Sequence, residues 1–321
     1  MHNQIAHAER VYASAQQKSA AASSPIIASW QRCMSMYQLT PEQKRSPLRL
    51  TDYEFQMARE RSAQLIVEAS DELDRLFLTI GKAGCCLLLT DSKGVALDRR
   101  GAGSEDKDFR NLGLWTGAVW SEASAGTNGI GTAIADERSV SIYRDQHFLS
   151  SNIKLSCTSA PIRDHRGQLT AALDISTCRD DVNEAALAIL TQAVRDAALR
   201  IETNLFRSAF RGSRIVMVPC GGNPTAALLA VDKDDLILGA TRAARMALKL
   251  DDALIQAGIP ASDALHEEGR DSGADLMEAE RAALRRVLSR NNGNVSQAAQ
   301  HLGISRATLH RKMKKLSLHQ S

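Results

Sequence analysis

Basic side chains are concentrated in the last part of the chain, where they could neutralise a polyanion. Residues 276–321 contain nine Lys and Arg against two acids, Glu278 and Glu280, and so carry a net charge of +7. The rest of the chain contains 31 basic and 35 acidic side chains, a net charge of −4. The overall charge of +3 is therefore the sum of a strongly basic C-terminal part and a mildly acidic remainder. A basic module attached to a mildly acidic body is typical of proteins that bind nucleic acid.

The donors in this segment recur on one side of a helix predicted to begin after Ser305. Leu309, Met313 and Leu316 have the spacing of an inner face, which leaves polar and basic side chains on the outer face beside the small Ala307. The start of such a helix reaches base edges in the major groove, and flanking cations meet phosphates. We predict base or phosphate contacts by Ser305, Arg306, Thr308, His310 and Arg311. Lys312, Lys314 and Lys315 are predicted to neutralise the charge of the DNA backbone.

Three predicted helices position these donors. The first covers 277–289 and ends at the turn RNNG, the second begins at Asn294 and runs through VSQAAQHL, and the third begins at Ser305. Gly303 supplies the turn between the last two, since glycine tolerates positive φ, and two short helices around such a turn form a helix-turn-helix. Asn294 and Ser296 are predicted to hold a phosphate, because free amides at a helix start favour an anion.

The stretch NNGNVSQAAQHLGISRATLHRKMKKL resembles the Fis-type DNA-binding domain at the C-terminus of bacterial enhancer-binding regulators. The asparagine before the second helix, the Ala-Ala pair, the Leu-Gly-Ile turn and the Ser-Arg-x-Thr-Leu opening stand in the order of that domain. Members of that family bind palindromic DNA as dimers. The resemblance therefore implies a homodimer that binds double-stranded DNA at a palindromic operator, and it disfavours a merely solvated basic helix.

A second group of residues could bind a small molecule. Trp115 and Trp120 flank the glycine run AGTNGIG, and they could line an apolar cavity, although ordinary core packing explains each of them too. His147 and Cys157 could contact the same ligand or form a nucleophile pair, but no third orienting residue is evident, so we predict no catalytic residue. The glycines are spaced GxxGxG, which excludes a dinucleotide-binding loop.

A mixed α+β domain is predicted to carry this second group. Apolar residues recur at three- and four-residue steps from Asp52 to Ile80, which predicts an amphipathic helix, and CCLLLTDSKGVALDRR predicts a hairpin. RSVSIYR and CTSAPIRDHRGQLTAALDIS predict further strands of an antiparallel sheet. The helix predicted from Val182 to Phe210 has a near-heptad apolar stripe, which either packs on this sheet or forms a dimer helix that carries a signal out of the domain.

The stretch WSEASAGTNGIGTAIADERSVSIYRDQHF, with CTSAPIRDHRGQLTAALDIST and the preceding SWQRC, resembles the GAF domain of the acetoin-catabolism regulator family. The resemblance covers most of residues 24–270 and implies a sensor for a small-molecule effector. The strand-turn-strand-helix pattern after Arg214 is similar to a shortened PAS domain. Gln146 stands where that family usually has an acidic residue, so a charge-dependent ligand contact by His147 does not follow from the resemblance.

Regulators of that family normally carry an ATPase domain between sensor and DNA-binding domain. Here no GxxxxGK[ST] loop is present, and the distance from Leu265 to Met277 is too short for such a domain. We therefore expect no ATPase activity and regulation by occupancy, through recruiting or blocking RNA polymerase. The predicted organisation is a helical lead at 1–50, a GAF-like sensor with flanking signalling helices at 51–210, a PAS-like module with a linker in 211–274 (the linker at 261–274), and a Fis-type helix-turn-helix at 275–321.

Several classes of protein are disfavoured by composition. The six cysteines are scattered without a CxxC pair, so we predict no metal site, no cofactor and no disulfide framework. No apolar run of signal-peptide or membrane-spanning length occurs, which favours the cytoplasm. A ligand-responsive, dimeric transcription regulator is the predicted function. A thiol-based GAF sensor enzyme and a ligand-independent, nucleoid-type DNA-bending protein are the alternatives from other classes.

Overall fold

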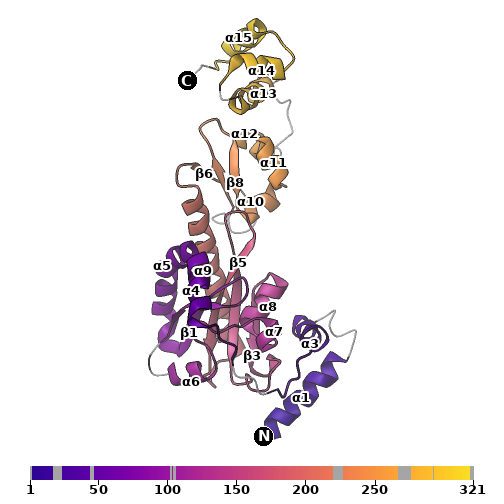
Figure 1. The fold of residues 1–321 in the computed structure, drawn as a ribbon, viewed down its shortest axis with the longest axis vertical. Helices are drawn as coiled ribbons and strands as arrows, with labels where there is room; N and C mark the ends of the chain where they lie inside the picture. The colour runs from indigo at the N-terminus through magenta and orange to yellow at the C-terminus, as the bar shows by residue number, and fades with distance from the viewer. Residues whose placement is uncertain are drawn as a thin grey trace. The chain divides into compact units, whose positions relative to one another are not determined.

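The computed structural model describes residues 2–16, 24–43, 47–101, 103, 106–219, 227–266, 276–291 and 293–318. The chain forms two compact units, one of residues 1–164 with 168–208 and one of residues 165–167 with 209–321. The first unit contains a five-stranded sheet, and the second contains a three-stranded sheet and the C-terminal helices (Figure 1). The predicted α+β class is confirmed.

The sheet of the first unit is antiparallel throughout and has the strand order β2-β1-β5-β4-β3. Its central strand is therefore the last one in sequence; β4 joins it through the short turn at 164–168, whereas β1 pairs with it from far away along the chain. Side chains along the central strand alternate between two buried faces, with Leu173 on one face and Asp174 on the other. The strands are β1 (Cys85–Asp91), β2 (Ala96–Arg100), β3 (Val140–Tyr143), β4 (Ser156–Arg163) and β5 (Leu169–Thr177).

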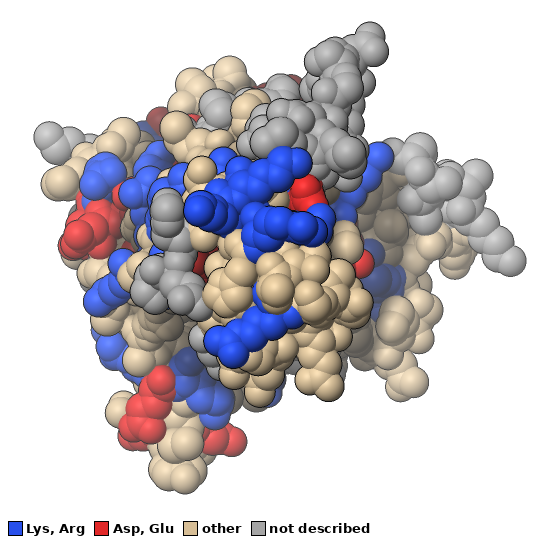
Figure 2. Space-filling model, turned by 90° about the horizontal axis from the view of Figure 1, so that it is seen from above, with Lys and Arg blue, Asp and Glu red and all other residues tan. Residues whose placement is uncertain are grey.

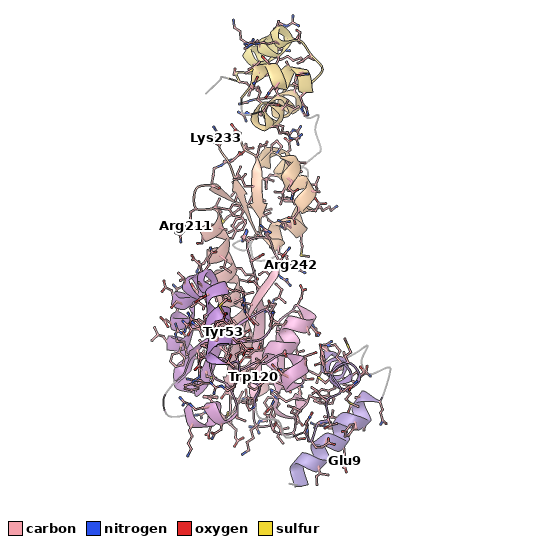
Figure 3. The ribbon with its side chains drawn as sticks, in the orientation of Figure 1. Glu9, Tyr53, Trp120, Arg211, Lys233 and Arg242 are labelled. Carbon is pink, nitrogen blue, oxygen red and sulfur yellow. The ribbon has the colours of Figure 1, made fainter. Side chains whose placement is uncertain are left out.

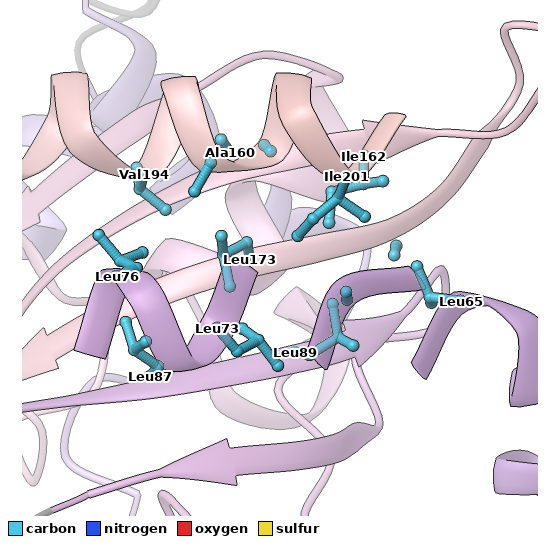
Figure 4. Close-up of a cluster of buried hydrophobic side chains, with 14 of the residues drawn as sticks. Leu65, Leu73, Leu76, Leu87, Leu89, Ala160, Ile162, Leu173, Val194 and Ile201 are labelled. Atoms are coloured by element: carbon cyan, nitrogen blue, oxygen red, sulfur yellow. The ribbon is translucent and has the colours of Figure 1, made fainter. Parts of the chain in front are cut away.

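Helices α4 (Asp52–Arg61), α5 (Ala63–Ile80) and α9 (Glu184–Ala209) contribute to the core on one face of this sheet. In Figure 4, Leu73 and Leu76 of α5 lie against strand β1, and Val194 and Ile201 of α9 lie beside the neighbouring strands. The alternative in which the apolar stripe of α9 packs on the sheet is therefore confirmed.

The single helix predicted from Asp52 to Ile80 is in fact two helices. The backbone leaves helical geometry at Ser62, where φ is −103° and ψ is 14°, and that residue closes α4 and opens α5. Thr51 starts α4 with a capping box, in which its hydroxyl accepts from the Glu54 amide and the Glu54 carboxylate accepts from the Thr51 amide.

The opposite face of the sheet is covered by shorter elements, and two of the predicted ligand-binding residues, Trp120 and Cys157, belong to the core on this face. Phe109, Trp120 and Ile130 form a second core cluster with side chains of β1, β4 and β5. The N-cap residue Asn128 holds the glycine-rich start of α8, because its Oδ1 accepts from the Gly131 amide at 2.9 Å. These elements are α6 (Asp106–Asn111), α7 (Glu122–Ala125) and α8 (Gly129–Asp136). The 3₁₀ turns η1 (Gly81–Ala83) and η2 (Arg144–Gln146) follow α5 and β3.

The N-terminal lead consists of α1 (His2–Ala15) and α3 (Pro25–Ser35) and belongs to the first unit. Val11 and Trp30 of the lead pack with Phe148 of the segment that follows η2. The indole Nε1 of Trp30 also donates to the carbonyl of Gln146 at 2.9 Å. The lead is thus attached to the sensor by its own apolar cluster.

The second unit begins with a small antiparallel sheet in the order β6-β7-β8. The predicted strand, acidic turn, strand and helix are confirmed here. The linker predicted at 261–274 differs, because its first part forms α12 with Ala261 and Ala264 buried in the core of this sheet; residues 267–275 lie outside the described part of the chain. The elements are β6 (Arg214–Met217), β7 (Leu228–Val231), β8 (Ile237–Ala240), α10 (Arg242–Ala247), α11 (Asp252–Ala257) and α12 (Ala261–His266).

Three C-terminal helices follow, as the sequence predicts: α13 (Leu276–Arg290), α14 (Val295–His301) and α15 (Arg306–Lys315). Gly303 turns the chain between the last two with a φ of 65°, in the left-handed region that favours glycine. The core of the three helices is made of Leu284, Val295, Ala298, Ala299, Leu309, Met313 and Leu316.

Candidate nucleic-acid interface and sensor site

The third C-terminal helix has the two faces that its sequence predicts. Leu309, Met313 and Leu316 are buried, while Thr308 and Lys312 are half-buried. In Figure 2, which views Figure 1 from above, blue Lys and Arg patches predominate over red acidic ones near the middle of the view. The exposed predicted contact residues of this helix and its cap are Ser305, Arg306, His310, Arg311, Lys314 and Lys315.

Side-chain caps fix the starts of both helices of the helix-turn-helix. The Ser305 hydroxyl accepts from the Thr308 amide at 3.1 Å. Asn294 Oδ1 accepts from the amides of Ser296 and Gln297 at 3.1 and 3.2 Å. The Asn294 amide in turn donates to the Asn291 carbonyl at 2.8 Å. The amides of Asn294 and Ser296, predicted to be free for a phosphate, are therefore already paired, although both side chains are exposed.

One predicted phosphate-binding lysine has a partner within the protein. Lys312 forms an ion pair with Glu280 of α13, and the hydrogen bond from Lys312 lowers the pKa of that carboxyl. The tertiary fold thus places an acid of α13 beside one of the predicted phosphate-binding cations. Lys312 thus joins α15 to α13 and differs from Arg311, which points to solvent.

The two tryptophans predicted to line a ligand cavity contact other protein groups. Trp120 is 4% exposed, belongs to the core cluster beneath α6 and α8, and donates from Nε1 to the Gly113 carbonyl at 2.9 Å (Figure 3). Trp115 is half-buried, and the guanidinium groups of Arg99 and Arg110 lie over its ring at 4.2 and 4.1 Å from the centroid. Core packing therefore accounts for Trp120, and cation–π stacking accounts for Trp115.

His147 and Cys157 do lie together, in the interior. His147 Nε2 is 3.4 Å from the Cys157 Sγ, and Nδ1 donates to the Arg144 carbonyl at 2.9 Å, so Nε2 accepts from the thiol. Burial lowers the pKa of His147 to about 4, and burial together with nearby Asp174 raises the pKa of Cys157 well above its usual range. Both groups are neutral at pH 7, which disfavours a thiolate nucleophile.

A buried carboxyl beside this pair was missed by the sequence reasoning. Asp174 is 1% exposed; its Oδ1 accepts from the Ser159 hydroxyl, and its Oδ2 accepts from the Ser176 hydroxyl at 2.5 Å. Burial raises the pKa of Asp174 to about 6, against the lowering effect of the two hydrogen bonds. The available sequence signal was an acid inside the apolar strand LTAALDIST. We name Asp174, Ser159, Ser176, Cys157 and His147 the interior polar cluster.

Helices α7 and α8, next to the interior polar cluster, are joined to the N-terminal lead by ion pairs. Arg32 of α3 donates to Glu122 from Nε at 2.9 Å and from Nη2 at 2.8 Å, and Nη2 lies 2.8 Å from Asp136 of α8. The buried Glu122 carboxylate also accepts from the hydroxyls of Ser29 at 2.5 Å and Thr132 at 2.9 Å. The SWQRC motif therefore joins α3 to both α7 and α8.

Three further features bear on the search for a site: a groove beside the sheet, the metal-ligand types and Gln146. An open groove of about 470 Å³ lies between β3 and α9, with Ser141 and Thr191 among its lining residues and joined by a 2.7 Å hydrogen bond. Within the described residues, no cluster of His, Cys, Asp and Glu could hold a metal ion, and no helix is long and apolar enough to cross a membrane. Gln146, at the departure from the family pattern, accepts the Tyr143 amide with its side chain at 2.8 Å.

Two protein families match this chain. Residues 2–202 match the family described as MimR, N-terminal domain, and residues 276–316 match the family described as Bacterial regulatory protein, Fis family. The first match contains the lead, the five-stranded sheet and most of α9, and the second contains the three C-terminal helices. The predicted Fis-type helix-turn-helix is thereby confirmed.

Curated relatives of the chain are transcriptional regulators. The acetoin catabolism regulatory protein of Cupriavidus necator is 33% identical over 226 residues, which cover 69% of this chain and 34% of that protein. The acetoin dehydrogenase operon transcriptional activator AcoR of Bacillus subtilis is 29% identical over 54% of this chain and 29% of its own length. The propane 2-monooxygenase operon transcriptional activator MimR of Mycolicibacterium smegmatis is 28% identical over 58% of this chain and 30% of its own length. The chain thus spans about a third of the length of these relatives.

A solved structure shares the fold. The crystal structure of the E. coli DhaR(N)-DhaL complex matches with a TM-score of 0.52 and 18% sequence identity, over 76% of this chain and 86% of that chain. The matching N-terminal region is GAF-like, which agrees with the antiparallel sheet and flanking helices of the first unit.

Proposed function

The chain belongs to the family described as MimR, N-terminal domain, and from that premise we propose that it is a dimeric transcription regulator whose DNA binding responds to a small-molecule effector. The single observation that carries this proposal is the outer face of α15 within a Fis-type helix-turn-helix. That face offers Arg306, Arg311 and Lys314 to solvent, on a helix fixed by an N-cap and a closed apolar core. Exposed donors on such a helix suit the major groove and its phosphates.

Two copies of the DNA-binding helices are proposed to bind the halves of a palindromic operator. A dimer doubles the number of phosphate contacts, and its symmetry matches that of the DNA. Helix α9 leads from the sensor toward the second unit along the chain, so it is the element through which we propose the sensor acts. Regulation is by occupancy, including contact with or exclusion of RNA polymerase, without ATP hydrolysis by this chain.

The effector is proposed to be a small uncharged molecule that contains oxygen. The relatives are named for acetoin catabolism and for a propane 2-monooxygenase operon, and both names concern short-chain compounds. In support of the same class, the interior polar cluster offers hydroxyl groups, a neutral imidazole and one carboxyl. The neutral thiol of Cys157 gives no support to a thiol-based enzyme.

DNA selection followed by affinity measurement tests the proposal. Duplexes selected from a random pool by the full chain should bind far more tightly than random duplex of the same length, as measured by fluorescence anisotropy. Arg311→Ala should weaken binding about 10- to 100-fold if the guanidinium contacts a base. Arg290 is an exposed arginine at the end of α13, so Arg290→Ala is the matched control and should change affinity much less.

Two outcomes would contradict the proposal in different ways. Equal affinity for selected and random duplex would instead indicate a nucleoid-type DNA-bending protein. An Arg311→Ala variant that binds selected DNA as tightly as the unaltered chain would remove the outer face of α15 from the interface.

A further inference from the structure

Strand β3 forms one edge of the five-stranded sheet, and some of its backbone groups point away from the sheet. The amide of Arg144, directly after β3, donates to the Leu155 carbonyl, directly before β4, at 2.9 Å. Hydrogen-bonded and non-hydrogen-bonded pairs alternate in an antiparallel ladder, so the amides and carbonyls of Ser141 and Tyr143 face outward. An outward row of such groups on an edge strand is a template for a further strand.

One of these outward groups has a partner that imitates such a strand. The Tyr143 amide donates to the side-chain oxygen of Gln146 at 2.8 Å, where the carbonyl of a further strand would otherwise lie. The outward amide and carbonyl of Ser141 have no partner within the described residues. Gln146 therefore closes only part of the edge.

The open groove of about 470 Å³ lies beside this edge, with α9 as its other wall. The lining residues of α9 have the spacing of one helical face, namely Glu184, Leu187, Ala188, Thr191, Gln192 and Arg195. A peptide that adds to β3 as a strand points alternate side chains at this face of α9.

Two hydrogen bonds show the direction of β3 relative to α9. Tyr143 Oη donates to the carbonyl of Val182, just before α9, at 3.2 Å. Ser141, nearer the start of β3, is bonded through its hydroxyl to Thr191 Oγ1, farther along α9, at 2.7 Å. The two elements therefore run in opposite directions, and a strand added antiparallel to β3 runs in the direction of α9.

The two ends of the groove carry opposite charges. Glu184 and Arg195 are exposed, and neither forms an ion pair within the described residues. Their separation in sequence corresponds to about 16 Å along the helix. An extended chain covers that distance in about five residues. The groove thus complements a segment with a positive charge at the Glu184 end and a negative charge about five residues later.

We propose that the groove between β3 and α9 docks an extended segment of a partner protein, which adds as an antiparallel strand to β3 and carries a basic residue about five positions before an acidic one. The outward backbone groups of β3 supply hydrogen bonds to this segment, and the two charges select its direction and register. The partner then lies against α9, the helix that leads out of the sensor. This inference goes beyond the proposed function and does not depend on DNA binding.

Peptide display provides a probe for this groove. Random dodecapeptides on phage are selected on the immobilised full chain, and an enriched peptide is labelled with fluorescein and titrated by anisotropy. The enriched peptides should share a Lys or Arg about five positions before an Asp or Glu. No enrichment, or enrichment without this order of charges, overturns the proposal.

Two substitutions at one position separate the backbone of β3 from its side chains. Ser141→Pro removes the outward amide, which the ladder to β4 does not use, whereas Ser141→Ala keeps that amide and removes the hydroxyl. Ser141→Pro should weaken peptide binding at least about 10-fold, and Ser141→Ala less than about 3-fold. A folded Ser141→Pro variant that binds the peptide as tightly as the unaltered chain overturns the proposal.

If Ser141→Pro does not fold, N-methylated peptides decide. A methyl group placed on one peptide amide at a time should weaken binding only at alternate positions, because alternate amides of an added strand face β3. Equal effects at successive positions overturn the proposal.

A charge reversal tests the direction of the segment. Arg195→Glu should weaken binding of the selected peptide at least about 3-fold, and a peptide with Lys in place of its acid should recover the affinity. Arg207→Glu is the matched control, because Arg207 is an exposed arginine of α9 that does not line the groove. Equal weakening by the two reversals contradicts the proposed placement of the charges.

A second copy of the chain is the alternative occupant of this edge. If Ser141→Pro lowers the mass found by sedimentation equilibrium and no peptide is selected, the edge joins two protomers and the proposal is overturned. Affinity for selected DNA separates this inference from the proposed function. A chain that binds the peptide but no DNA supports the docking groove and refutes the proposed function, and a chain that binds DNA but no peptide refutes only the docking groove.

Discussion

Replacement of Asp174 by Asn should stabilise the first unit at neutral pH, although it removes an acid with two hydrogen bonds. Asn resembles the protonated carboxyl in size and in having one acceptor oxygen and one donor, so it keeps a neutral group beside Ser159 and Ser176. The change therefore removes the ionisation of a group that is buried without a cation among the described residues.

The size of the effect follows from the pKa of Asp174. Burial raises that pKa from 3.8 to about 6, and each unit corresponds to about 1.4 kcal/mol. The pKa of Asp174 is higher in the folded state than in the unfolded state. Below pH 3.8 the carboxyl is protonated in both states and does not destabilise the fold, and as pH rises through about 6 its ionisation lowers the free energy of unfolding. Asp174→Asn should thus raise the free energy of unfolding by about 3 kcal/mol at pH 7.5 and by almost nothing near pH 4.

His147 acts in the opposite direction over the same range of pH. Burial lowers its pKa from 6.5 to about 4, so its neutral form stabilises the fold above pH 6.5, and about 3 kcal/mol of this stability is lost as pH falls to 4. The two contributions offset each other between pH 4 and pH 6. The Asp174→Asn variant should therefore lose stability with acid more steeply than the unaltered chain.

Urea unfolding followed by tryptophan fluorescence measures both effects, because all three tryptophans lie in the first unit. Glu72→Gln is the control, since it makes the same change of acid to amide at a buried carboxylate that is paired with Arg75 and Arg200. That variant should be destabilised at pH 7.5. If Asp174→Asn lowers the free energy of unfolding at pH 7.5, and by the same amount as at pH 4, the argument from burial is refuted.

Further predictions concern the lead and the DNA-binding helices. Arg32→Ala should lower the free energy of unfolding of the first unit by about 3 kcal/mol in the same urea assay, because Glu122 stays buried without its cation; an unchanged midpoint would show that the hydroxyl bonds suffice. Ser305→Ala should weaken the start of α15 by about 1 kcal/mol, seen as faster hydrogen exchange of the Thr308 amide, whereas exchange at an unchanged rate would contradict the capping role. The logarithm of DNA affinity should fall with the logarithm of salt concentration by about 0.9 for each phosphate contacted, and a flat response would argue against the basic face of α15.

The local sequence determined the C-terminal helices and most of the strands. The spacing of Leu309, Met313 and Leu316, the capping residues Asn294 and Ser305 and the intervening glycine all act within a few turns of helix, so each signal is complete in the segment that carries it. The hairpin of β1 and β2 was predictable for the same reason, because its turn lies between two short β-prone runs.

Tertiary structure alone decided which of these residues share a site. The strand sequence LTAALDIST fixes that Asp174 and Leu173 point to opposite faces, but the burial of both faces depends on α8 and α5, which lie far away along the chain. The pairing of Lys312 with Glu280 and the clamp of Arg32 on Glu122 likewise join residues 32 and 90 positions apart. Spacing within one segment carries no information about such contacts, because packing of separate elements creates them.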